Sequence, residues 1–221
     1  MTHPLDPGLD RSRLRFHPTQ ADLDGSGSLP TMSGIAFDPA APRVEQIDLT
    51  DIAHALAQQV RYAGHTRTRI STAEHSVLVS RLVPDRYALW GLLHDAAEAY
   101  LNDLPRRVKA LLPDYLRLEA QVMDCIVARF GLEPVDGDMP ECVRAADDEV
   151  AHLESHHLGR PFDNDSALMA YPVATGAASH LRVQGLDWKD ARALFLARFI
   201  EITGDAPEAY RARALRNATA A

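Results

Sequence analysis

A histidine and an aspartate stand side by side, as His94 and Asp95, within an apolar stretch of the sequence. A buried imidazole and a buried carboxylate are each unfavourable without a partner, and a divalent metal ion is one such partner. Adjacent residues of a helix project about 100° apart, so both side chains could hold an ion beside the helix, with Glu98 facing the same side one turn later. Taken alone, such a dipeptide is more often a hydrogen-bonded pair with no catalytic role.

Further candidate ligands lie on both sides of this pair. His75 is expected in the first turn of a preceding helix, where packing of consecutive helices would bring it against His94. In a later segment Val143, Asp147, Val150 and Glu154 form one stripe at helical spacing, so the carboxylate of Asp147 interrupts an otherwise apolar face, whereas Asp148 points elsewhere. Arginine and lysine side chains, which donate hydrogen bonds to phosphate oxygens, flank these segments. They are Arg61, Arg67, Arg69, Arg106, Arg107 and Lys109.

Apolar periodicity predicts the helices that would carry these residues. We expect them at about residues 50–60, 71–83, 85–101, 114–131, 140–158 and 187–204. Thr50 or Asp51 is expected to cap the first, and Ser71 with Glu74 has the form of a capping box, in which each side chain bonds the other's backbone amide. Trp188 is expected to face inward from the last. Strand-like patterns are confined to short pieces at about 35–49, so the fold class is all-α.

Composition indicates one domain of 221 residues, 46% of them hydrophobic. We expect a loose, Pro- and Gly-rich N-terminal arm at 1–34, the catalytic domain at 35–204, and a C-terminal helix or tail at 205–221. A net charge of -8 argues against surfaces for nucleic acid or anionic membranes. No apolar run reaches membrane-span length and the start lacks signal-peptide order, which predicts a cytoplasmic protein. Cys125 and Cys142 are expected to be buried packing residues.

Three strings, RYAGHTRTRISTAEHS, LLHDAAEAYLNDLPRRVK and RAADDEV, resemble the HD-domain metal-dependent phosphohydrolases, and within them the bacterial and phage 5'-deoxynucleotidase-like branch. The resemblance covers about residues 50–158 and implies an HD-domain helical bundle. It implies metal ligands at His75, His94, Asp95 and Asp147, catalytic roles for Glu98 and Asp95, and substrate-binding residues at Arg61, Tyr62, Asp103 and Lys109. The loop between Arg61 and His75 is one residue shorter than in the family.

The resemblance implies hydrolysis of (deoxy)nucleotides, with 5'-deoxynucleotidase activity on monophosphates as the expected reaction and deoxynucleoside triphosphate triphosphohydrolase activity as the alternative. A non-catalytic nucleotide-binding module, a metal-bound oxygenase, a cyclic-dinucleotide phosphodiesterase and a helical scaffold are the other classes considered. Imidazole and carboxylate ligands suit Mn, Fe, Co, Ni or Zn, and Mg is compatible. From Ala96 to Ala146 the chain has no histidine that could hold a second ion, so one ion is expected. A homodimer is expected from the family.

Overall fold

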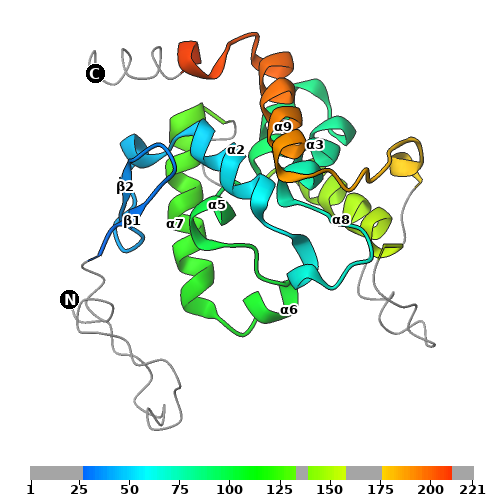
Figure 1. Ribbon diagram of the computed structural model, residues 1–221, viewed down its shortest axis with the longest axis horizontal. Coiled ribbons are helices and arrows are strands. Elements are labelled where there is room, and N and C mark those ends of the chain that lie inside the picture. Colours follow the sequence, from blue (N-terminus) through cyan, green and yellow to red (C-terminus); the bar gives the residue numbers. More distant parts are fainter. Residues whose placement is uncertain (1–26, 133–138, 158–175, 211–221) are drawn as a thin grey trace, which may run out of the picture.

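The computed structural model describes residues 27–132, 139–157 and 176–210 (Figure 1). A short antiparallel hairpin pairs Leu29–Pro30 (β1) with Ala36–Phe37 (β2). The α-helices are Leu49–Gln58 (α2), Thr72–Leu82 (α3), Ala88–Leu93 (α4), Glu98–Leu101 (α5), Arg106–Lys109 (α6), Pro113–Phe130 (α7), Glu141–Ser155 (α8) and Trp188–Thr203 (α9). The predicted all-α fold is confirmed. Within these residues no helix is both long and apolar enough to cross a bilayer.

Helix α3 lies at the centre of the bundle, in contact with α2, α4, α8 and α9 (Figure 1). Every residue from Thr72 to Ser80 is buried. Helix α4 approaches α3 closely at Gly91, where an added Cβ would lie 2.9 Å from the Cα of Ser80. Because real Cβ atoms do not approach backbone this closely, glycine at this position permits the contact. The close packing brings the residues that follow α4 next to α3.

Local signals located most helix ends correctly. The hydroxyl of Ser71 accepts from the Glu74 amide at the start of α3, and the Asp187 carboxylate accepts from two amides at the start of α9. Helices α7 and α9 end at Gly131 and Gly204, both in the left-handed conformation that glycine adopts without strain.

Other expectations about the helices were wrong. Helix α2 is capped by Asp48, two or three residues earlier than the predicted Thr50 or Asp51. The carboxylate of Glu74 does not complete a capping box, because it accepts from the amides of residues 184–186 in the chain that approaches α9. Trp188 is 38% exposed, and Phe199, which the periodicity did not single out, is buried in its place.

The single helix predicted at about 85–101 is divided in the structure. Helix α4 ends at Leu93 and α5 begins at Glu98, with a turn between them. The amides of Ala96, Glu98 and Ala99 donate to carbonyls three residues earlier, which is the tighter 3₁₀ pattern. His94 and Asp95 therefore lie at the junction of two helices, and not within one continuous helix.

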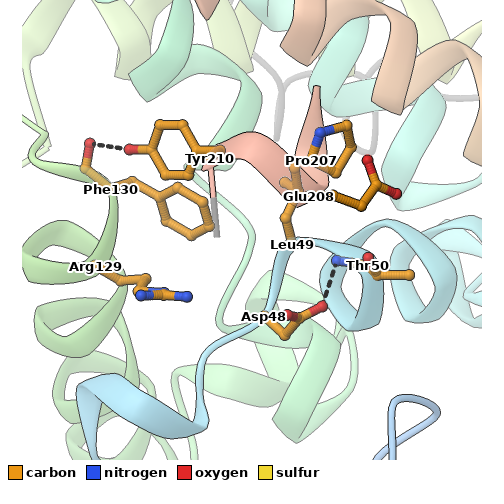
Figure 2. Close-up of a pocket in the computed structure, with 8 residues that line it drawn as sticks. All are labelled: Asp48, Leu49, Thr50, Arg129, Phe130, Pro207, Glu208 and Tyr210. Atoms are coloured by element: carbon orange, nitrogen blue, oxygen red, sulfur yellow. Dashed lines mark hydrogen bonds between the residues drawn. The ribbon is translucent and has the colours of Figure 1, made fainter. Parts of the chain in front are cut away.

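The segments at the two ends are only partly described. Residues 1–26 of the predicted arm and 211–221 of the predicted tail lie outside the described residues, as does Gly159, the predicted end of α8. Tyr210 is buried, and its hydroxyl donates to the carbonyl of Phe130 across 2.9 Å. Figure 2 shows the pocket of about 160 Å³ beside it, which Asp48 and Arg129 also line. None of the predicted site residues lines this pocket.

Candidate metal centre

Four side chains from three parts of the chain converge beside α3. His75 comes from the first turn of α3, His94 and Asp95 from the turn after α4, and Asp147 from α8. His75 Nε2 lies 3.0 Å from Asp147 Oδ1 and 3.7 Å from Asp95 Oδ2. His94 Nε2 lies 3.2 Å from Asp95 Oδ2 and 3.9 Å from Asp147 Oδ1. Ligand atoms of His75, His94 and Asp95 all lie within 4.8 Å of one another, so this group could hold a metal ion.

Both imidazoles are oriented by a hydrogen bond at Nδ1. His94 Nδ1 lies 2.9 Å from the carbonyl oxygen of Gly91, and His75 Nδ1 lies 2.9 Å from Glu154 Oε1. A carbonyl and a carboxylate can only accept, so each Nδ1 carries the proton. Each Nε2 is buried and has no hydrogen-bond partner among the described residues, despite the nearby carboxylates. Anchoring at Nδ1 with Nε2 directed at the carboxylates is the arrangement of metal-binding histidines, so these residues fit a divalent ion.

Each imidazole or carboxylate in the cluster stabilises the charged form of its oppositely charged neighbours. Burial by itself lowers the pKa of His94, but the Asp95 and Asp147 carboxylates outweigh it and hold this pKa well above its ordinary value. Burial by itself raises the pKa of Asp147, but the two imidazoles hold it well below the usual range. The pKa of Asp95 is lowered in the same way, with His94 the main opponent of burial. The carboxylates are thus kept ionised, which is the form that binds a metal.

Arg61 borders the cluster on one side. Its Nε donates to Glu154 Oε2 across 2.9 Å, and its Nη1 lies 3.5 Å from Asp95 Oδ2. The next residue, Tyr62, donates from its hydroxyl to the same Glu154 oxygen across 3.0 Å. Tyr62 and Ala63 have positive φ angles of 57° and 52°, which are unfavourable for residues with a Cβ. The loop is therefore held in a strained conformation beside the candidate metal ligands.

Glu98 lies on another side with Lys109. Lys109 Nζ, on α6, donates to Glu98 Oε1 and to Glu119 Oε1, both across 2.6 Å. Glu98 Oε2 is buried and has no hydrogen-bond partner in the described part of the chain. Burial, together with Asp95 and Asp103, raises the pKa of Glu98 well above its ordinary value, and Lys109 only partly opposes this. Burial also raises the pKa of Asp103, and the nearby positive charge of Arg61 partly opposes this rise.

Comparison with known proteins places the chain in a family. It is 37% identical over 175 residues to the uncharacterized protein YfdR of Escherichia coli (strain K12), across 78% of this chain and 94% of YfdR. It is also 35% identical over 138 residues to an uncharacterized protein of Rhodobacter capsulatus, across 58% of this chain and 70% of that protein. This chain belongs to the YfdR family. No family model matches it.

In this YfdR-family chain the structure brings all four predicted metal ligands together, with Arg61, Tyr62 and Glu98 around them. Of the other predicted cations, Arg69 binds backbone carbonyls, whereas Arg106 contacts the candidate ligand Asp147. Arg69 donates to the backbone carbonyls of Ala57 and Leu186. Arg106 pairs with Asp148 and Asp147, at 2.9 and 3.4 Å. Both cysteines are partly buried and pack against the core.

Sequence reasoning missed Glu154 as a site residue in this YfdR-family chain. Its signal was present: Glu154 continues the helical stripe of Val143, Asp147 and Val150, and its side chain is fully buried. A buried carboxylate two helical turns beyond a candidate ligand is itself a sign of a partner in the site.

Proposed function

We propose that this protein is a metal-dependent phosphohydrolase that removes the 5'-phosphate from 2'-deoxynucleoside monophosphates. The observation that carries the proposal is the cluster of two Nδ1-anchored imidazoles facing two ionised carboxylates, with a guanidinium at its border. The two imidazoles and two carboxylates suit a divalent ion, and the guanidinium suits an oxyanion beside it. The motif resemblance supplies the nucleotide as the substrate class.

In this proposal Asp147 completes the ligand set of His75, His94 and Asp95, and one ion is bound. Two imidazole nitrogens and two carboxylate oxygens suit Mn, Fe, Co, Ni or Zn. When bound, the ion supplies a Lewis acid for a phosphoryl oxygen and lowers the pKa of a coordinated water. Asp95 has a catalytic role in addition to binding the ion, because its carboxylate lies between both imidazoles and Arg61.

The protein's own groups then act on the phosphate and the sugar. Arg61 balances charge on the phosphoryl oxygens, and Lys109 sets the position and charge of Glu98 across their 2.6 Å contact. Because its pKa is raised, Glu98 holds a proton to a higher pH than a free glutamate does and can deliver it to the departing 5'-oxygen. Asp103 accepts from the 3'-hydroxyl and crowds a 2'-hydroxyl, which favours deoxy substrates. The products are a nucleoside and inorganic phosphate.

The test is a turnover screen of all deoxy- and ribonucleoside mono- and triphosphates with Mn, Co, Zn and Mg. Wild type is expected to release phosphate from deoxynucleoside monophosphates, and His94→Ala is expected to release none. Variation of the exposed His65 to Ala is the matched control and should behave as wild type. Release of triphosphate from deoxynucleoside triphosphates would favour the triphosphohydrolase. Metal binding without any turnover would favour a non-catalytic nucleotide-binding module.

A further inference from the structure

One buried carboxylate contacts both the candidate metal ligands and the candidate phosphate-binding loop. The side chain of Glu154, near the C-terminal end of α8, is fully buried. Its Oε1 lies 2.9 Å from Nδ1 of His75. Its Oε2 accepts from Nε of Arg61 at 2.9 Å and from the hydroxyl of Tyr62 at 3.0 Å. One oxygen thus contacts a candidate metal ligand, and the other contacts the loop that carries Arg61 and Tyr62.

The contact to His75 determines which imidazole nitrogen is available. The Glu154 carboxylate forms an ion pair with the guanidinium of Arg61, so it is ionised and acts as an acceptor. An ionised carboxylate has no proton to donate, so Nδ1 of His75 must donate to it. Nε2 is then directed at Asp147 and Asp95, where a metal ion would bind in place of the Nε2 proton. A metal-binding histidine depends on such a partner for its tautomer and its ring orientation.

The contacts to Arg61 and Tyr62 fix the strained loop. A residue with a Cβ at positive φ is strained and persists only where surrounding contacts hold it. Tyr62 is in this conformation, and its hydroxyl is held between Glu154 and the carbonyl oxygen of Ala151, both on α8. Without the Glu154 carboxylate, Arg61 would lose the acceptor that places its guanidinium beside Asp95.

We propose that Glu154 is a positioning residue that orients His75 for the metal ion and Arg61 for a phosphate, so that one carboxylate sets both geometries. This inference rests on the proposed metal site and deepens it. A buried charge is weak evidence for stability, since apolar replacements are often as stable. The site geometry is the reason why a carboxylate occupies this core position.

The first test is the affinity of Glu154→Gln for Zn²⁺, measured by chelator competition on the metal-free full chain. The glutamine side chain has one accepting oxygen and one donating NH₂ group. The NH₂ must face either Nδ1 of His75 or the donors of Arg61 and Tyr62, so one of these two sets of hydrogen bonds is lost. Loss of such a partner weakens metal binding by about 10–100-fold. The matched control is Glu149→Gln: Glu149 is also buried on α8, but it accepts from the amides of Gly176 and Ala178. The control should bind Zn²⁺ as wild type does.

Binding of inorganic phosphate to the zinc-loaded protein, measured by calorimetry, tests the Arg61 side. Glu154→Gln should weaken it at saturating Zn²⁺, and the Glu149→Gln control should not. Glu154→Asp keeps the charge, but its side chain is one methylene shorter. This variant should be closer to wild type in the stability of its fold than in its affinity for Zn²⁺. Wild-type Zn²⁺ and phosphate affinities in Glu154→Gln, or an equal loss in Glu149→Gln, would overturn the proposal.

A measurement on the wild-type protein keeps the test decisive even where Glu154→Gln does not fold. Long-range ¹H–¹⁵N spectra of the zinc-loaded chain should show His75 with its proton on Nδ1 and the metal on Nε2. A proton on Nε2 or zinc on Nδ1 would overturn the assignment. None of these measurements uses a nucleotide, so they stand apart from the proposed function. A protein that binds zinc as described and hydrolyses no nucleotide would contradict the proposed function alone.

Discussion

Replacement of His94 by alanine should abolish the stabilisation that a metal ion provides. His94 is 5% exposed, and its Nε2 lies within 4 Å of both carboxylates of the cluster, at 3.2 and 3.9 Å. A ligand at a concentration of 100 Kd stabilises a folded protein by about 2.7 kcal/mol. For a chain of this size each kcal/mol shifts Tm by about 2–4 °C, so wild type should gain about 5–11 °C.

The variant should gain far less. If loss of the imidazole weakens binding by about 100-fold, the same metal concentration equals Kd and contributes only about 0.4 kcal/mol. The expected shift is then about 1–2 °C. The metal-free Tm will also fall, because alanine leaves a cavity and carboxylates without their partner. The informative quantity is therefore the difference between Tm with and without metal.

The assay is thermal unfolding by circular dichroism, with each protein first stripped by chelator and then titrated with Mn²⁺, Co²⁺ or Zn²⁺. His65→Ala controls for histidine loss at an exposed position and should keep the full shift. An unchanged metal-induced shift in His94→Ala would refute the assignment of His94 as a ligand. A shift that is equally small in His65→Ala would show that stabilisation comes from surface binding.

The remaining predictions concern the proton donor, the sugar and the packing of α4. Glu98→Gln should retain metal but lower kcat by about 100- to 10,000-fold. The raised pKa of Glu98 keeps its carboxyl protonated to a higher pH than that of a free glutamate, so wild-type kcat should fall as pH rises through that pKa. If the pH–rate profile of Glu98→Gln keeps this alkaline fall, Glu98 is not the proton donor. Asp103→Asn should narrow the ratio of kcat/KM between dAMP and AMP, and a wild type that turns over both equally would remove the basis for this prediction. Gly91→Ala should destabilise the protein by about 1–3 kcal/mol in urea unfolding, because its Cβ would meet the Ser80 Cα at 2.9 Å, and an unchanged midpoint would show that the two helices separate easily.

The helices and their ends could be predicted because their determinants lie within a few residues of one another. Ser71 bonds an amide three residues later, and Gly131 and Gly204 end helices through their own backbone freedom. The same local view failed where a distant segment offered a better partner. Glu74 is such a case, since its carboxylate reaches the backbone at residue 184 and beyond.

The candidate ligand residues were likewise visible in the sequence, because a histidine or carboxylate on an apolar helix face requires a partner wherever it packs, and their order as a ligand set came from the resemblance to the HD-domain phosphohydrolases. Their convergence was decided by tertiary packing, through the close approach of α4 to α3 at Gly91. The division of the predicted helix at His94 was also invisible, since no glycine or proline marks it. Glu154 joins His75 and Arg61 across separations of 79 and 93 residues. No spacing rule reaches that far, so only the packing of α8 against α3 could show which carboxylate orients the site.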